Sequence, residues 1–361
     1  MGLFNSFSFG FLSNVEREDQ LVNAIKDYNV KEVKTIIEQA NKTDKLLDLN
    51  KIYENGRDPF ILACIKNVEI TEILLGYADS KNILLDLNRK SNFKDYPLIW
   101  ACIKSSAELV ELLIDYANRH QIILILNDKS ELGDYPMYWA CNKNNIEIAQ
   151  LLINYANNHQ ILLNINESDD LGDYPLLLAC PAHNNNVEMA KLLIDYSNDH
   201  HFLLNLNEKN EEGFDILLEA IHNNNIEMVQ ILMSYADQNH IILDLNEKND
   251  DKIYPLLIAI YNKNTPIAEL LMTYAKNNSF ILNINEKGNR GNYPLKVVIK
   301  DNNVEMARLL LNYASENNIV LKINQYDIEE FEGIRNEIND LFIKYEKSIY
   351  KYFGENNNSN L

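Results

Sequence analysis

The sequence predicts an all-α structure built from stacked helical repeats, with protruding turns or short hairpins between the units. Three columns of residues recur in one register, with a step close to 39 residues. A fixed period of this size is typical of solenoids and other repeat arrays. The first column is Pro59, Pro97, Pro136, Pro175, Ile216, Pro255 and Pro294. The second is Asn50, Asn88, Asn127, Asn166, Asn207, Asn246, Asn285 and Asn324, and the third is Ala63, Ala101, Ala140, Ala179, Ala220 and Ala259.

The first helix of each unit is predicted to begin at the proline column. Proline is tolerated at the first helical position because its missing N–H would be unpaired there in any case. In the unit that contains Pro136, Asp134 is expected to cap the helix, since a carboxylate accepts hydrogen bonds from free backbone N–H groups. The small residue at Ala140 indicates a close approach between neighbouring helices.

The second helix of the same unit is predicted to begin after Asn145. Asparagine is a favoured N-cap, and Glu147 follows in the first turn, where the helix dipole stabilises an anion. The unit ends in an extended segment in which Leu163 and Ile165 alternate with asparagines, so one side of that segment should be buried. A polar turn with a frequent glycine, such as Gly133, then leads to the next proline, and we expect positive φ at that glycine.

Residues Tyr96–Cys102 and Tyr174–Cys180 have the pattern Tyr-Pro-Leu-x-x-Ala-Cys. This pattern resembles the ankyrin repeat, in which the family has Thr-Pro-Leu-His-x-Ala-Ala, and the resemblance covers roughly residues 18–324. It implies inner and outer helices, finger-like turns and a concave binding surface. The unit here is longer than the family's, which has about 33 residues; HEAT or armadillo arrays, with about 40–47 residues, are the alternative. The threonine and histidine that tie the family's turns together are replaced, so packing is expected to take over their role.

The period divides the chain into five predicted parts. These are an apolar N-terminal tail (1–17), an N-terminal helical cap (18–49), seven ankyrin-like repeats (50–323), a C-terminal capping helix (324–353) and a disordered tail (354–361). End repeats need a polar outer face, which the 18–49 segment supplies. A partner-binding helix is the alternative for 324–353.

The first residues match the pattern of a lipidation signal. Gly2 and Ser6 fit the Met-Gly-x-x-x-Ser pattern of N-myristoylation, although an apolar tail without a lipid is the alternative. The segment lacks the cationic start of a secretory signal. No run approaches the length of a membrane-spanning helix, so no integral membrane segment is expected.

Composition excludes some partners and favours one compartment. The net charge of −20 argues against nucleic acid as a partner. Cys64, Cys102, Cys141 and Cys180 all follow the alanine column, where buried free thiols are a better interpretation than a metal or disulfide set. Free thiols are typical of a reducing compartment. We therefore expect a cytoplasmic protein, and a monomer.

The sequence contains no motif for catalysis or cofactor binding. It lacks a phosphate loop, a Gly-x-Ser-x-Gly elbow, a His-Glu-x-x-His pair and a Cys-x-x-Cys pair. His120, His159 and His200 form a column that is expected to be solvated. The prediction is therefore no cofactor, no metal and no enzymatic activity; an enzyme with an unrecognised site remains a remote alternative.

Candidate partner-binding residues fall in two places. On the first helices they are Trp100, Ile103, Lys104, Trp139, Asn142, Lys143, His222 and Tyr261. On the turns they are Asp128, Glu131, Glu167, Asp169, Asp170, Glu208, Glu211, Glu212, Asp250 and Asp251.

The acidic turns would attract a basic segment of a partner protein, and they contrast with the preceding turn, which carries Arg89, Lys90 and Lys94. The alternatives are acids that serve only solubility and tryptophans that serve only packing. The sequence thus predicts a non-catalytic protein–protein interaction scaffold or adaptor. A membrane-tethered adaptor or effector, held through Gly2, is the second hypothesis.

Overall fold

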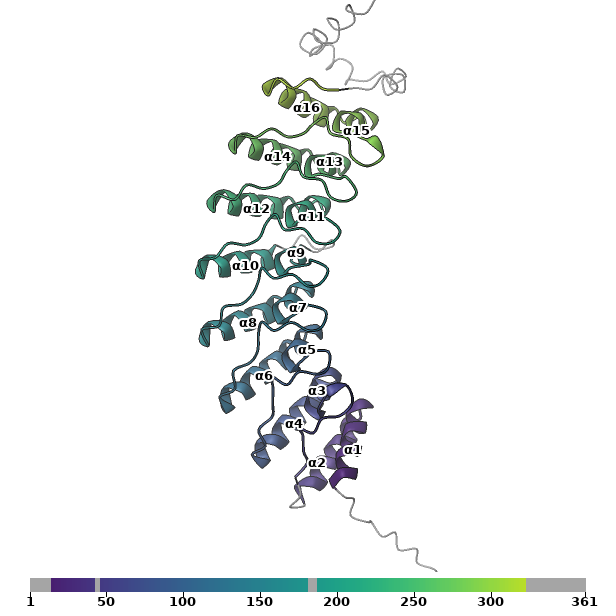
Figure 1. Cartoon of the computed structure of the whole chain (residues 1–361), viewed down its shortest axis with the longest axis vertical. Helices are drawn as coiled ribbons and strands as arrows, with labels where there is room; N and C mark the ends of the chain where they lie inside the picture. Colours follow the sequence, from purple (N-terminus) through teal and green to yellow (C-terminus); the bar gives the residue numbers. More distant parts are fainter. Residues whose placement is uncertain (1–13, 43–45, 181–186, 323–361) are drawn as a thin grey trace, which may run out of the picture. The chain divides into compact units, whose positions relative to one another are not determined.

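The computed structural model describes residues 14–42, 46–180 and 187–322. Across these residues it contains sixteen α-helices, two short 3-10 helices and no β-strand, which confirms the predicted all-α class (Figure 1). The chain divides into two compact units, Met1–Asp170 (unit 1) and Leu171–Leu361 (unit 2). The predicted C-terminal helix at 324–353 and Gly2 lie outside the described residues.

Unit 1 is a stack of four helix pairs in two layers. In this article the first helix of each pair is called inner and the second outer. The inner helices are α1 (Asn14–Lys26), α3 (Pro59–Lys66), α5 (Pro97–Ile103) and α7 (Pro136–Asn142). The outer helices are α2 (Val30–Asn41), α4 (Val68–Lys81), α6 (Ala107–His120) and α8 (Ile146–Asn158), and the 3-10 helix η1 (Glu54–Gly56) lies in a turn. Each helix packs on the same-layer helix of the next pair.

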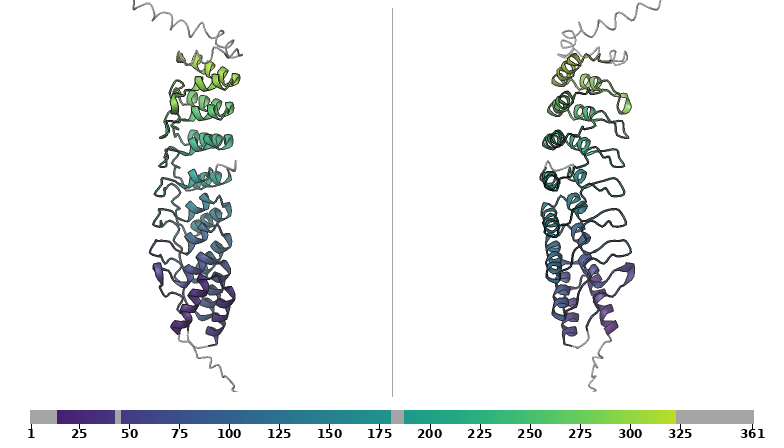
Figure 2. Two further views of the ribbon diagram at one scale, coloured as in Figure 1. Left: turned by 90° about the vertical axis from the view of Figure 1, so that its right-hand side faces the viewer. Right: turned by 60° about the vertical axis from the view of Figure 1, so that its left-hand side comes forward.

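Unit 2 repeats this arrangement. Its inner helices are α9 (Pro175–Leu178), α11 (Ile216–His222), α13 (Pro255–Tyr261) and α15 (Pro294–Lys300). Its outer helices are α10 (Glu188–Asp199), α12 (Ile226–Gln238), α14 (Thr265–Asn277) and α16 (Val304–Glu316), and η2 (Asn289–Gly291) lies in a turn. In each unit the turns between pairs protrude on the side of the inner helices (Figure 2).

The inner helices begin where the proline column predicts, but the expected cap at Asp134 is wrong. Tyr135 occupies the N-cap position of α7 and makes no side-chain cap hydrogen bond. Asp134 therefore precedes the cap by one residue, and its buried Oδ1 accepts no hydrogen bond from any residue that the structure describes. A true aspartate cap forms where no tyrosine intervenes: Asp58 accepts from Ile61 N at 2.8 Å and Asp215 accepts from Leu218 N at 2.7 Å.

The outer helix of the unit that contains Pro136 is capped as predicted, whereas α6 is capped by Ser106 and α10 has Val187 at its N-cap without a side-chain cap bond. Asn145 accepts the backbone N–H of Ile148 at 3.0 Å, and the equivalent asparagines of other repeats do the same. The alanine column is fully buried, with Ala140 at 0% exposure. Because the alanine side chain is small, it lets the neighbouring helices pack closely at this position. Leu163 and Ile165 are buried as well, which confirms the one-sided burial of the extended segment.

The glycine of the turn has positive φ, as the sequence predicts. Gly133 has a φ of +82°, and a Cβ there would lie 2.8 Å from the backbone nitrogen of Asp170 in the next turn. Glycine thus serves twice, because it adopts the left-handed conformation and lets two successive turns touch.

Hydrogen bonds from side chains hold each repeat to the next, which corrects the expectation that packing alone would do so. The hydroxyl of Tyr135, which stands in the place of the family's threonine, donates to the carbonyl of Glu167 at 2.7 Å. The Asn127 amide donates to Leu162 O at 2.8 Å and accepts from Asn164 N at 3.0 Å. Both contacts recur between most neighbouring repeats of each unit.

Candidate functional site

The two tryptophans of the chain lie at equivalent positions of neighbouring inner helices. Trp100 is on α5 and Trp139 is on α7, both half-buried, and α5 packs directly against α7. Each indole Nε1–H is covered by protein and has no hydrogen-bond acceptor among the described residues. Buried donors are rarely left unpaired, so these rings differ from the hydrogen-bonded tyrosines of the core.

Cations lie over both indole rings. The guanidinium carbon of Arg57 is 5.5 Å from the Trp100 ring centroid, and the ammonium of Lys143 is 5.1 Å from that of Trp139. Arg57 also forms a 2.8 Å ion pair with Asp95, whose side chain is 8% exposed. Trp100 is therefore held by an arginine whose charge is already neutralised, whereas Lys143 is exposed at the end of its helix.

The other predicted helix residues of unit 1 lie at the C-terminal ends of the same two helices. Ile103 is half-buried, and Lys104 and Asn142 are exposed. Lys104 and Lys143 occupy the C-cap positions of α5 and α7, where a positive charge complements the helix dipole. The structure thus brings these residues together with Trp100 and Trp139 on one surface of unit 1.

In unit 2 the equivalent surface has a different character. His222 and Tyr261 are exposed at the ends of α11 and α13, and the His222 ring lies 5.7 Å from that of Phe214. The neighbouring Asn262 amide donates to Ile221 O at 2.9 Å, which ties the two inner helices together. This surface is polar and carries neither tryptophan.

Several of the predicted turn acids are engaged in contacts between repeats. Asp128 forms an ion pair with Lys90, and Glu167 forms one with Lys129 at 2.8 Å. Tyr138 donates to Asp169 at 2.8 Å. These three acids therefore take part in contacts between repeats, while the side chains of Asp128 and Glu167 stay 47% and 49% exposed.

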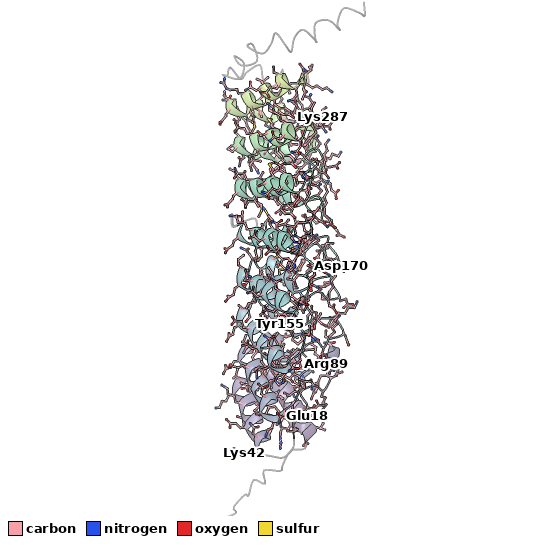
Figure 3. The ribbon with its side chains drawn as sticks, turned by 90° about the vertical axis from the view of Figure 1, so that its left-hand side faces the viewer. Glu18, Lys42, Arg89, Tyr155, Asp170 and Lys287 are labelled. Atoms are coloured by element: carbon pink, nitrogen blue, oxygen red, sulfur yellow. The ribbon has the colours of Figure 1, made fainter. Side chains whose placement is uncertain are left out.

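The basic turn of the preceding repeat is neutralised in the same way. Arg89 lies 3.2 Å from the carboxylate of Asp58, which is 1% exposed, and Lys90 pairs with Asp128. Figure 3 shows Arg89 and Asp170 at the same edge of unit 1. Lys94 is exposed and has a left-handed backbone, with φ of 58°.

The remaining predicted acids are exposed at the turn tips. Unit 1 has Glu131 and Asp170; unit 2 has Glu208, Glu211, Glu212, Asp250 and Asp251. Glu208 accepts from the Asn205 amide at 2.7 Å. The acidity of the free tips is therefore greatest in unit 2, where Glu211 and Glu212 are followed one repeat later by Asp250 and Asp251.

A lysine column was missed by the sequence reasoning. Lys129, Lys209 and Lys248 each reach an acid of the following repeat, at 2.8, 3.6 and 2.6 Å respectively. The signal was present, because the motif Asn-acid-Lys recurs at Asn127, Asn207 and Asn246. Each lysine pairs with the acid that follows the column asparagine of the next repeat, which is Glu167, Glu247 or Glu286.

The described residues contain no cluster of histidine, cysteine or acidic side chains that could hold a metal ion. The expected solvated histidine column packs instead: the His120 ring lies 4.1 Å from that of Tyr116, and its Nε2 lies 2.7 Å from the Asp79 carboxylate. Cys64, Cys102, Cys141 and Cys180 are free and buried, and burial raises the thiol pKa of each. Among the described helices none has the length and apolar character needed to cross a membrane.

The structure is similar to solved ankyrin domains. The ankyrin repeat domain of Bcl-3, described as a unique member of the IkappaB protein family, is 20% identical over 70% of this chain and 97% of that one, with a TM-score of 0.47. An ankyrin repeat domain from Acinetobacter baumannii AYE is 18% identical over 60% of this chain and 97% of that one, with a TM-score of 0.44. No curated protein sequence matches the chain.

A family model supplies the stronger result. The model described as ankyrin repeats (3 copies) matches residues 21–119, 81–162 and 157–242, which together make up more than half of the chain. The chain belongs to the ankyrin repeat family.

Proposed function

We propose that this chain is a non-catalytic scaffold or adaptor that binds a protein partner through its inner-helix surface and turn tips. Ankyrin repeats are in general protein–protein interaction modules without catalytic activity. One observation within the chain carries the proposal: buried positions keep the same residue from repeat to repeat, whereas the neighbouring exposed positions change.

The contrast is clear on the inner helices. The alanine four residues after the start of the inner helices, as in Ala101 and Ala140, is buried throughout, and in α15 the equivalent Val298 is buried too. The position two residues later is Ile65, Ile103, Asn142, His222, Tyr261 and Lys300 in the described repeats; the two isoleucines are half-buried and the other four side chains are exposed. Uniform exposed residues would suffice for solubility, so the varied set supports a surface that recognises a particular partner.

For unit 2 we propose a partner segment that is basic. Glu211, Glu212, Asp250 and Asp251 are exposed on consecutive turns, so their potentials add and steer a cationic chain during its approach. A single exposed ion pair contributes only about 0–1 kcal/mol, and several acids must therefore act together.

The experiment begins by capturing the partner with the full-length chain. Association rates are then measured at low and at physiological salt for the variant Glu211→Lys, Glu212→Lys, Asp250→Lys, Asp251→Lys. We expect slower association and a weaker salt dependence, since screening acts within about 8 Å at physiological ionic strength. The matched control reverses four exposed acids of the outer helices, Asp195, Asp199, Asp237 and Glu269. Equal rates for both variants and the unmodified chain would refute the steering role, and a chain that retains no protein partner would refute the scaffold function.

A membrane tether through Gly2 is the second proposal, supported by the Met-Gly-x-x-x-Ser pattern. One myristoyl chain gives only marginal membrane binding, and Glu16, Glu18 and Asp19 add no second signal. The test is the intact mass of the chain after eukaryotic expression, with Gly2→Ala as control; an unacylated mass would remove the proposal. We further propose a cytoplasmic monomer, a setting with which the four free thiols agree.

A further inference from the structure

We propose that the inner-helix surface of unit 1 binds an acidic protein segment that carries an aromatic or large aliphatic side chain. The surface, called here the Trp–Lys surface, consists of Trp100, Ile103, Lys104, Trp139 and Lys143. The inference rests on the proposed interaction function and specifies the partner chemistry for this unit. The charge of this partner segment is negative, whereas the segment proposed for unit 2 is positively charged.

The apolar part of the Trp–Lys surface comes from two indole rings and one isoleucine. Trp100, Trp139 and Ile103 are all half-buried, so each offers apolar area to a partner. Tryptophan is among the residues that most often dominate binding energy at interfaces.

The charged part comes from two lysines that no acid neutralises. Lys104 and Lys143 are exposed and form no ion pair with any described residue, in contrast to Lys90 and Lys129 of the same unit. The ammonium of Lys143 lies over the Trp139 ring, so charge and apolar surface are adjacent.

Two acids near the inner helices are engaged in contacts. Asp95 pairs with Arg57, and Asp169 accepts from Tyr138. Glu108 and Glu147 are exposed on the outer helices α6 and α8, and neither forms an ion pair with Lys104 or Lys143. The Trp–Lys surface therefore presents two unpaired lysines on a chain whose net charge is −20.

A short acidic protein segment fits this surface better than a nucleic acid. Both would present anions to the lysines and planar or apolar groups to the indoles. Exposed Glu131 and Asp170 on the turn tips of unit 1, however, repel an extended polyanion. A few carboxylates beside one apolar side chain can meet Lys104 and Lys143 without passing those tips.

The experiment selects short random peptides displayed on phage against the immobilised full-length chain. Peptides that also bind the variant Lys104→Glu, Lys143→Glu are removed. We expect the remaining peptides to be enriched in aspartate and glutamate next to aromatic or large aliphatic residues. Basic or uncharged sequences in that pool, or no peptide that depends on the two lysines, would overturn the inference.

Binding of a selected peptide free of tryptophan is then followed by intrinsic tryptophan fluorescence. The chain has two tryptophans, both in the Trp–Lys surface, so the signal reports on this surface alone. We expect a saturable change in emission as the peptide is added. The affinity from this titration should be at least tenfold lower for Lys104→Glu, Lys143→Glu. The variant Lys252→Glu, Lys287→Glu, which makes the same charge change at exposed turns of unit 2, should bind normally.

Two further arms separate the explanations. A single-stranded oligonucleotide that gave the same saturable change at a similar concentration would replace the protein partner with a nucleic acid and overturn the inference. A native partner retained equally by the unmodified chain and by Lys104→Glu, Lys143→Glu would overturn it too, while leaving the scaffold function intact. If the unmodified chain captured no protein partner at all, the scaffold function itself would be contradicted.

Discussion

The hydroxyl of Tyr155 on α8 accepts the backbone N–H of Leu124 from the preceding repeat at 3.0 Å. The same hydroxyl donates to Ile122 O at 3.2 Å, so one side chain satisfies two backbone groups of an extended segment. Tyr116, Tyr274 and others repeat the contact. A segment that lacks strand partners thereby obtains its hydrogen bonds from the neighbouring helix.

The first prediction concerns this hydroxyl. Tyr155→Phe keeps the ring, which is 3% exposed, but leaves Leu124 N–H and Ile122 C=O without their partner. We expect the free energy of unfolding to fall by about 1–3 kcal/mol, the cost of leaving buried polar groups unpaired. The fall is measured as a lower midpoint of urea unfolding. Tyr261→Phe is the control, because Tyr261 is 38% exposed and should tolerate the change. Equal midpoints for both variants would contradict the structural role of the Tyr155 hydroxyl.

The second prediction concerns the asparagine that joins two repeats. Asn127→Asp keeps the acceptor for Asn164 N but places a carboxylate oxygen where an amide donor lies 2.8 Å from Leu162 O. We expect a loss of about 1–3 kcal/mol at neutral pH, part of which returns at acidic pH, where the protonated carboxyl can donate. Asn127→Ala lacks both contacts at every pH and should show no such recovery. The free energy of urea unfolding at two pH values measures the difference.

Two glycines give opposite predictions for the same substitution. Gly76 lies within α4, and a Cβ added there would have no neighbouring atom within 4 Å. Gly76→Ala should therefore stabilise the chain by roughly 0.5–1 kcal/mol. Gly133→Ala should destabilise it by about 1–3 kcal/mol, because φ is +82° and the Cβ would lie 2.8 Å from Asp170 N. Thermal unfolding of the two variants measures both. A stabilised Gly133→Ala would contradict the close approach of the turns.

Much of the fold could be predicted because it depends on local chemistry repeated in one register. The proline at the helix start, the asparagine cap of the outer helix and the buried alanine each follow from backbone geometry, and Pro136, Asn145 and Ala140 confirm them. The position of the aspartate cap was missed because Tyr135 fits the N-cap position without donating or accepting a cap bond. The choice between Asp134 and Tyr135 depends on packing, which the sequence pattern does not display.

The candidate site was less predictable, because the pairing of charged side chains is decided between repeats. Asp128 and Asp170 are both exposed acidic turn residues, yet Asp128 forms an ion pair with Lys90 whereas Asp170 forms none with a described residue. The pairing connects residues 38 positions apart. Only the stacking geometry shows which acids remain available, although the recurrent Asn-acid-Lys motif gave a usable hint.

The last prediction concerns the buried N-cap Asp215, which is 5% exposed. Burial raises the pKa of its carboxyl to about 6, partly opposed by the hydrogen bond from Leu218 N. The usual pKa in an unfolded chain is about 3.9, so the folded state binds more protons between these values. This group therefore contributes its greatest stability below pH 4 and loses it as the pH rises through 6. A gap of about two units corresponds to roughly 2–3 kcal/mol.

Asp215→Asn should remove that loss and keep the cap, because asparagine is an equally good N-cap residue. We expect the variant to be more stable than the unmodified chain at pH 7, with the difference closing as the pH falls below about 4, the unfolded pKa, as measured by urea unfolding. Asp58→Asn is the comparison: its carboxyl pKa is also raised by burial to about 6, but Arg89 lies 3.2 Å away. Removing that carboxylate leaves Arg89 only its longer ion pair with Asp86, at 3.5 Å, so the gain at pH 7 should be smaller. If the stability difference for Asp215→Asn were independent of pH, the raised pKa would not be the cause.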